Sequence, residues 1–119
     1  ISIDRKGGAK TMREMFKKTK EKITKGFSIV IFPEGTRKKP GEEPNYKSGF
    51  LGIYNNLNTE ILPIAVNSGN FWPKDTFIKK PGKIIISILN VLPANLERKD
   101  LLKKVQSIIE EESNKLNNF

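Results

Sequence analysis

The side chains best suited to chemistry lie in one short polar stretch and at two separate basic positions. Phe32-Pro-Glu-Gly-Thr-Arg37 presents a carboxylate, a hydroxyl and a guanidinium directly after an apolar run. Arg5 follows an earlier apolar stretch, and Lys47 lies downstream of the polar one. Arg5 and Arg37 end consecutive predicted strands, so their guanidinium groups could converge on one anion and bind two of its oxygens at once.

The element that positions this stretch is the run Phe27–Phe32, which is apolar apart from one serine. A continuous apolar run of this length predicts a strand that is buried on both faces. Pro33 cannot donate a hydrogen bond to a neighbouring strand, and Pro-Glu-Gly has turn chemistry. We therefore expect a strand that delivers Glu34, Thr36 and Arg37 to the rim of a sheet, where α/β proteins bind their ligands.

Apolar runs alternate with amphipathic ones, which predicts an α/β fold with a mixed, mostly parallel sheet flanked by helices. Strands are expected over residues 27–32, 61–66 and 84–89, and residues 1–5 are expected to be the tail of an earlier strand. Helices are expected over residues 9–25, 48–56 and 96–116, from the spacing of their apolar residues. Asn95 is placed to cap the last helix. The core stripe predicted for that helix is Leu101, Leu102, Val105, Ile108 and Ile109.

Composition limits what the site can be. The chain of 119 residues has room for one domain, contains no cysteine and no histidine, and has a formal net charge of +9. Disulfides and thiolate metal sites are therefore excluded, and the commonest general base is missing. The charge favours anionic partners, namely nucleic acid, acidic lipid surfaces or phosphorylated substrates. The sequence shows no signal peptide and no apolar run long enough to span a membrane.

Four segments resemble, in order, signature blocks of the glycerolphosphate acyltransferase superfamily, which includes the 1-acyl-glycerol-3-phosphate acyltransferases. Ile3-Asp-Arg5 resembles the second block, and Phe32-Pro-Glu-Gly-Thr-Arg37 resembles the third. Lys47-Ser-Gly49 matches the Lys-x-Gly arrangement that follows the third block. Ile61-Leu-Pro-Ile-Ala-Val66 resembles the fourth block, with Pro63 as its proline. The third block is fairly specific, whereas the other three gain from their order and spacing.

The first block of that family, His-x-x-x-x-Asp, has no counterpart because the chain contains no histidine. In the family this histidine is the general base, and the aspartate orients it. Since Ile1 already lies inside the second block, we expect the first block upstream of the chain. Residues 1–119 are interpreted as the C-terminal portion of a single acyltransferase domain, truncated at its N-terminal side. No catalytic residue is assigned within the chain, and we expect it to be inactive alone.

The resemblance implies an O-acyltransferase of phospholipid biosynthesis. Such an enzyme transfers an acyl group from an acyl thioester to the free hydroxyl of 1-acyl-glycerol-3-phosphate, giving phosphatidic acid. The implied partners are the lysophospholipid acceptor, acyl-CoA or acyl carrier protein as acyl donor, and an anionic membrane surface. No metal or other cofactor is implied, because a thioester is already activated for attack by a base-assisted hydroxyl. The implied location is the cytoplasmic face of a membrane.

The resemblance also implies roles for particular side chains. The substrate-binding residues would be Arg5, Glu34, Gly35, Thr36, Arg37 and Lys47, with Pro33 and Pro63 as structural positions of the motifs. The two arginines would bind the acceptor phosphate, and the lysine would add charge. The glutamate would lie near the glycerol hydroxyl or order the arginines. The glycine would let the backbone approach the ligand, and the threonine would donate a hydrogen bond.

Plainer interpretations of these residues remain open. Pro33–Arg37 also fits a simple turn that ends a strand, Arg5 fits an ion pair with Asp4, and Lys47 fits a solvated lysine. The lysines of the predicted helix 9–25 fit a solvated face. The aromatic residues Phe71, Trp72 and Phe77 fit either core or a patch that faces an acyl chain or a membrane.

Two other functions also remain open. The first is a related acyltransferase that acts on glycerol 3-phosphate or on another lysolipid. The second is a basic nucleic-acid-binding module, which the charge alone would allow. The aromatic residues, however, do not interleave with basic ones on strands as a stacking platform requires. We therefore expect no nucleic-acid partner.

Overall fold

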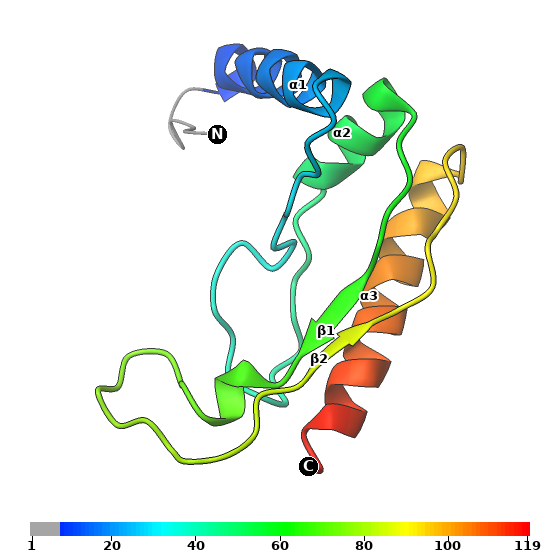
Figure 1. Ribbon diagram of the computed structural model, residues 1–119. Helices are drawn as coiled ribbons and strands as arrows, with labels where there is room; N and C mark the ends of the chain where they lie inside the picture. Colours follow the sequence, from blue (N-terminus) through cyan, green and yellow to red (C-terminus); the bar gives the residue numbers. More distant parts are fainter. Residues whose placement is uncertain (1–7) are drawn as a thin grey trace.

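The computed structural model describes residues 8–119 (Figure 1). The elements, in chain order, are α1 (Gly8–Thr24), α2 (Gly49–Leu57), β1 (Ile64–Val66), the 3₁₀ turn η1 (Ser68–Asn70), β2 (Ile86–Ile88) and α3 (Arg98–Leu116). The three predicted helices are confirmed, with bounds that differ by the one or two residues expected at helix ends.

The helix ends follow local sequence signals, with one exception. α1 stops at Gly26, which has a φ of 82°. Gly26 N–H donates to the carbonyl of Ile23 at 2.9 Å and Phe27 N–H to that of Lys22 at 3.0 Å, the paired bonds of a Schellman motif. The exception is Asn95, which was predicted to cap α3. It has a φ of 71°, and Glu97 occupies the cap position instead.

β1 and β2 form an antiparallel ribbon, in which Ala65 lies opposite Ser87. A bridge between Ile61 and Leu92 extends the pairing beyond the ribbon. The two strands therefore lie within the predicted ranges 61–66 and 84–89 but are shorter. The mostly parallel sheet predicted from the sequence is not confirmed, because the only pairing found in residues 8–119 is antiparallel.

The strand predicted over residues 27–32 is wrong for the structure described here. This segment runs from α1 toward the polar turn without pairing to any strand of residues 8–119. It is also far from buried, since 75% of Phe32 is exposed. A strand needs a hydrogen-bonding neighbour, and neither β1 nor β2 lies along this segment. Residues 27–32 therefore have the apolar sequence of a buried strand but no neighbouring strand to pair with.

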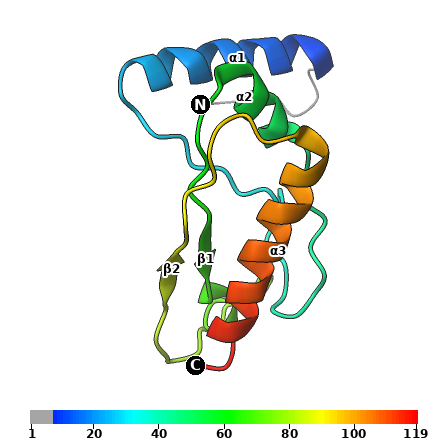
Figure 2. The same ribbon diagram turned by 90° about the vertical axis from the view of Figure 1, so that its right-hand side faces the viewer.

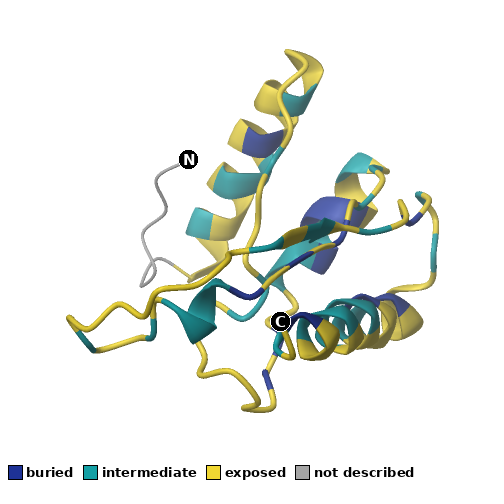
Figure 3. Cartoon of the chain, turned by 60° about the horizontal axis from the view of Figure 1, so that its bottom comes forward, coloured by how far each residue is buried: buried dark blue, intermediate teal, exposed yellow. Residues whose placement is uncertain are grey.

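The core lies between α2, α3 and the segments that lead into α2 and out of β2 (Figure 3). Its buried members are Tyr46, Leu51, Tyr54, Leu92, Leu101 and Val105. The predicted stripe of α3 is confirmed, because Leu102, Ile108 and Ile109 pack against this cluster beside Leu101 and Val105. The Tyr54 hydroxyl donates to the carbonyl of Pro93 at 2.6 Å and accepts from Leu96 N–H at 2.8 Å. These bonds join α2 to the chain that leads into α3.

α3 covers one face of the β1–β2 ribbon along its length (Figure 2). Under the helix, Ala65 is fully buried, and the Ser87 hydroxyl donates to a carboxylate oxygen of Glu112 at 2.7 Å. Asn67 fastens the end of the ribbon to the helix. Its side-chain oxygen accepts from Ile85 N–H at 2.8 Å, and its amide donates to the carbonyl of Leu116 at 3.3 Å. This arrangement orders the C-terminal half of the chain, to which the polar turn is attached through Lys47.

Candidate anion-binding site

The polar stretch forms a tight turn that is fastened to the start of α2. Gly35 N–H donates to the carbonyl of Phe32 at 3.1 Å and closes the turn. Lys47 N–H donates to the carbonyl of Pro33 at 2.7 Å, which holds the two motif segments side by side. Residues that are well separated in the sequence therefore form one local unit. The predicted turn is confirmed, although it follows an unpaired segment rather than a strand.

Gly35 is required by both the backbone and its neighbour. Its φ is 67°, a value that side chains other than glycine rarely adopt. A Cβ at this position would also lie 3.3 Å from Cγ of Lys47, which is tighter than ordinary contact. The stem of Lys47 therefore crosses directly over the glycine backbone. This contact keeps the lysine side chain close to the turn.

The turn offers cationic groups to solvent. Thr36, Arg37 and Lys47 are all exposed, and Arg37 forms no ion pair with any residue of the described part of the chain. A guanidinium and an ammonium group can each bind an anion, the first through two parallel hydrogen bonds. Of the predicted substrate-binding set, the structure thus gathers Glu34, Gly35, Thr36, Arg37 and Lys47. Arg5 lies outside the described residues.

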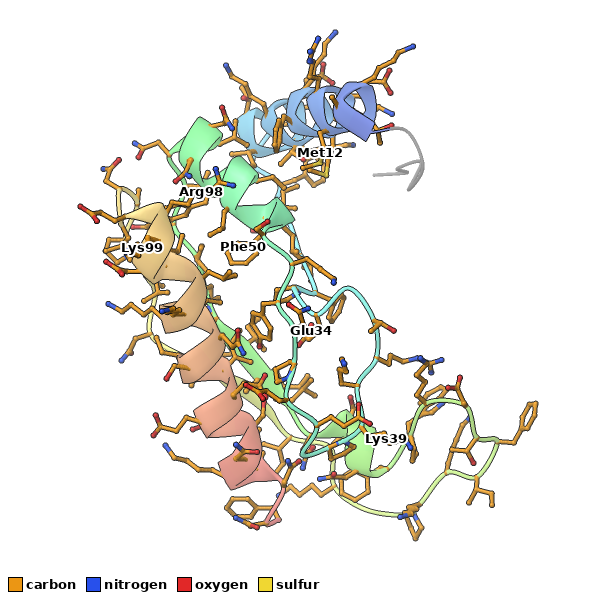
Figure 4. The ribbon with its side chains drawn as sticks, turned by 180° about the vertical axis from the view of Figure 1, so that it is seen from behind. Met12, Glu34, Lys39, Phe50, Arg98 and Lys99 are labelled. Atoms are coloured by element: carbon orange, nitrogen blue, oxygen red, sulfur yellow. The ribbon has the colours of Figure 1, made fainter. Side chains whose placement is uncertain are left out.

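Glu34 differs from its neighbours because it is half-buried. Figure 4 shows it between Phe50 of α2 and Lys39 of the following loop. Its charge acts on Tyr46, whose pKa is raised far above its usual range. The causes, in order of size, are burial, the hydrogen bond that the Tyr46 hydroxyl donates to Glu110 at 2.9 Å, the charge of Glu110, and the charge of Glu34. Glu34 is therefore close enough to Tyr46 for its charge to act on the phenol.

An apolar groove begins at the turn and runs between α1, the segment 27–33 and α2. Its volume is about 570 Å³, which is within the range of small-molecule sites, about 300–1,000 Å³. Met12, Phe50 and Ile53 contribute to its lining, and Lys47 lies at its wall together with Pro33. The motif and the groove are therefore continuous.

Three features of this region escaped the sequence analysis. Thr19 lines the groove, is almost fully buried, and its hydroxyl has no hydrogen-bond partner among the described residues. Tyr46 bonds to Glu110 of α3, a residue far away in the sequence. The groove itself depends on how α1 packs on α2. The only signal in the sequence is that Met12, Phe16, Thr19 and Ile23 share one face of α1 at helical spacing, and this spacing does not indicate which element the face contacts.

The remaining motif proline lies apart from the turn. Pro63 precedes β1, is fully buried, and its carbonyl accepts from Leu89 N–H at 3.0 Å. It therefore lies at the start of the ribbon and not beside Arg37. Of the helices in residues 8–119, none has the length and hydropathy that a membrane span requires.

Known proteins resemble this chain in sequence and in structure. It is 36% identical over 88 residues to the 1-acyl-sn-glycerol-3-phosphate acyltransferase of Pseudomonas aeruginosa, covering 74% of this chain and 34% of that protein. It is 30% identical over 90 residues to the protein of the same name from Limnanthes douglasii, covering 75% of this chain and 32% of that protein. The chain thus spans about a third of the length of these curated relatives.

The fold also has a counterpart among solved structures. The crystal structure of the 1-acyl-sn-glycerophosphate (LPA) acyltransferase PlsC from Thermotoga maritima matches with a TM-score of 0.73 and 24% identity, over 91% of this chain and 44% of that one. Residues 1–67, which include the turn, Lys47 and Pro63, match the family model described as Acyltransferase. That match covers more than half of the 119 residues. The chain belongs to the acyltransferase family.

Proposed function

We propose that the protein containing this chain transfers an acyl group from an acyl thioester to the free hydroxyl of 1-acyl-glycerol-3-phosphate, giving phosphatidic acid. The observation that best supports the proposal is that Arg37 and Lys47 are both exposed, in two segments of the family match that the bond from Lys47 N–H to the carbonyl of Pro33 holds together. The names of two relatives from distant organisms support the acceptor. Residues 1–119 would be the C-terminal portion of a single acyltransferase domain.

In this proposal the turn binds the acceptor phosphate. Arg37 supplies the guanidinium fork, and Lys47 adds charge from across the glycine backbone. Arg5, which lies outside the described residues, is proposed as the second arginine. Thr36 donates a hydroxyl hydrogen bond, and Gly35 lets the backbone come close to the ligand. These roles place the phosphate on the solvent side of the turn, next to the apolar groove.

The groove suits the acyl part of an acceptor whose phosphate lies at the turn. Its lining is mostly apolar and comes from α1, the segment 27–33 and α2. Burying methylene groups there gains about 0.8 kcal/mol for each group. The phosphate and one acyl chain of the same molecule would then be bound by neighbouring parts of the site. A membrane-associated protein at the cytoplasmic face would meet both the lipid acceptor and a CoA or carrier-protein thioester.

The chemical step needs a base for the acceptor hydroxyl, and a positioned base contributes about 10²–10⁴-fold. The chain has no histidine, so we propose that the base comes from a part of the protein outside these residues. Glu34 is a poor substitute, because a carboxylate is a much weaker base than an imidazole. Its proposed place is near the glycerol hydroxyl, or beside the arginines, which it would order. The step needs no metal, because the thioester is already activated.

The test is Arg37→Ala in the complete enzyme, with acylation of 1-acyl-glycerol-3-phosphate as the readout. Each lost charge-assisted hydrogen bond is worth about 1.5–3 kcal/mol, so we expect kcat/KM to fall about 10- to 150-fold per bond. Arg37→Lys should recover only part of the loss, because an ammonium group cannot form the fork. Arg98→Ala is the matched control, because Arg98 lies at the start of α3, away from the turn (Figure 4).

The acceptor makes the same test specific. Arg37→Ala should leave acylation of a monoacylglycerol, which has no phosphate, at the level of the unchanged enzyme. An unchanged kcat/KM for the phosphorylated acceptor would show that Arg37 is not its ligand. Preference of the unchanged enzyme for glycerol 3-phosphate or for another lysolipid would correct the acceptor but keep the acyl transfer.

A further inference from the structure

The loop between η1 and β2 extends away from the body of the molecule (Figure 1). It covers residues 71–83, and most of it is exposed in Figure 3. Its base is well fastened, because Lys80 N–H donates to the carbonyl of Phe71 at 2.9 Å. The ring of Phe71 packs so closely on Gly82 that a Cβ there would overlap it. The loop is therefore held at its base and projects its tip.

The projecting part carries large apolar side chains in solvent. Phe77 is fully exposed, 72% of Ile78 is exposed, and more than half of Trp72 is exposed. Isolated apolar residues on a surface are ordinary, but three on one projecting loop form a patch that indicates an interaction site. Of the aromatic residues whose interpretation the sequence leaves open, Trp72 and Phe77 are therefore not core, whereas Phe71 is partly buried against Gly82.

The same loop is positively charged. The loop has one acidic residue, Asp75, whose carboxylate lies 3.8 Å from the ammonium group of Lys74. Its lysines are Lys74, Lys79, Lys80 and Lys83. The ammonium group of Lys79 lies 4.1 Å from the centre of the Trp72 ring, within range of a cation–π contact. The loop thus combines exposed apolar side chains near its tip with a tryptophan and lysines nearer its base.

We propose that the loop 71–83 contacts the surface of an anionic lipid bilayer. Phe77 and Ile78 enter the apolar boundary, Trp72 lies at the level of the headgroups, and the lysines bind lipid phosphates. A bilayer fits because it accepts a protruding apolar tip without a matching pocket, whereas a folded partner must supply one. Nucleic acid offers negative charge but no apolar layer for the tip. The inference does not depend on the reaction proposed above.

Trp72 supplies the measurement, because it is the only tryptophan of the chain. Its fluorescence is followed as vesicles of phosphatidylcholine, with or without phosphatidylglycerol, are added to the 119-residue chain. We expect a blue shift with the anionic vesicles that weakens as salt is added. Lipids with brominated acyl chains should quench the emission, which reports contact of Trp72 itself. Binding through another surface would sediment the chain without shift or quenching and would overturn the proposal.

Paired variants test the two parts of the loop. The double change Phe77→Ser and Ile78→Ser should weaken partitioning about 10- to 100-fold, because two apolar side chains are lost. Lys80→Gln and Lys83→Gln should each weaken it about five-fold at low salt. The controls are Phe119→Ser, which is also exposed, and Lys99→Gln on α3, at the opposite end from the loop (Figure 4). Equal losses in the loop variants and controls would overturn the assignment.

Discussion

The two faces of the β1–β2 ribbon differ in polarity, and the more apolar face is the more exposed one. Under α3 lie small or polar side chains, Ala65 and Ser87. On the opposite face lie Ile64, Val66, Ile86 and Ile88, of which the last two are 65% and 68% exposed. A sheet with one solvated face normally places polar residues on that face. Here the β-branched apolar residues are the exposed ones.

Apolar side chains are also exposed away from the ribbon. The unpaired segment exposes Phe27, Val30, Ile31 and Phe32. The radius of gyration, 15.6 Å, exceeds the value of about 13.5 Å expected for a compact domain of this length. Near-continuous apolar runs are typical of strands covered on both faces. The apolar pattern of these strands is therefore that of a sheet packed on both faces. In the described residues, α3 packs on one face only, and the other face is exposed.

The largest expected effect comes from replacing one large apolar residue on the covered side of the ribbon and one on its open face. Leu101 of α3 is fully buried, whereas Ile88 lies on the open face of β2. Leu101→Ala should lower the free energy of unfolding by about 2–5 kcal/mol, because it removes buried surface and leaves a cavity. Ile88→Ala should cost less than about 1 kcal/mol. Urea denaturation of the 119-residue chain measures both. Equal losses would show that the open face is packed in solution.

A smaller effect is expected from adjacent residues of one strand. Ala65 points toward α3 with no exposed surface, and Ile64 points to the other face. Ala65→Leu should destabilise by about 1–3 kcal/mol, because three more carbon atoms must be fitted under the helix. Ile64→Leu, which keeps the volume, should stay within about 0.5 kcal/mol. The midpoint of urea denaturation checks both. A neutral Ala65→Leu would show that the contact with α3 is loose.

The elements that the sequence predicted well are those set by local pattern. α1, α2 and α3 have apolar stripes at helical spacing, and the Pro-Glu-Gly turn has its own residue chemistry. The predictions that failed are those of how strands pair with one another. Whether 27–32 forms a strand depends on a neighbour, and the direction of pairing between β1 and β2 depends on how the chain returns. A run of apolar residues carries neither kind of information.

The candidate site divides in the same way. The motif residues Glu34, Gly35, Thr36 and Arg37 were identifiable because they are consecutive, and Lys47 because it follows at a short spacing. The buried hydroxyl of Thr19 and the hydroxyl of Tyr46 were not, because their surroundings come from distant parts of the chain. Tyr46 bonds to Glu110 across 64 positions. Such a pair leaves no local pattern in the sequence.

The smallest expected effect concerns Tyr46. This residue bonds to α3, which covers the ribbon, and precedes Lys47 of the motif in the sequence. Only 5% of Tyr46 is exposed, and its hydroxyl donates to Glu110. Tyr46→Phe keeps the ring but removes this donor. We expect it to lower the free energy of unfolding by about 0.5–1.5 kcal/mol near neutral pH, measured by urea denaturation. Thr24→Val is the control, because the Thr24 hydroxyl also donates a hydrogen bond, but on the exposed surface of α1.

Alkaline pH should make the contribution of Tyr46 visible without comparing side-chain volumes. Burial, then the Glu110 hydrogen bond and the charges of Glu110 and Glu34, raise the pKa of Tyr46 in the folded chain. In the unfolded chain the phenol loses its proton near pH 10. The unfolded state then binds fewer protons than the folded one, so the stabilisation is complete below pH 10 and is lost as pH rises beyond it. The expected loss is about 1.4 kcal/mol per pH unit, and Tyr46→Phe should lack it. Subtracting the slope of unfolding free energy against pH for Tyr46→Phe from that of the unchanged chain removes the contribution of all other titrating groups. Equal slopes would show that the Tyr46 phenol ionises as readily in the folded chain as in the unfolded one.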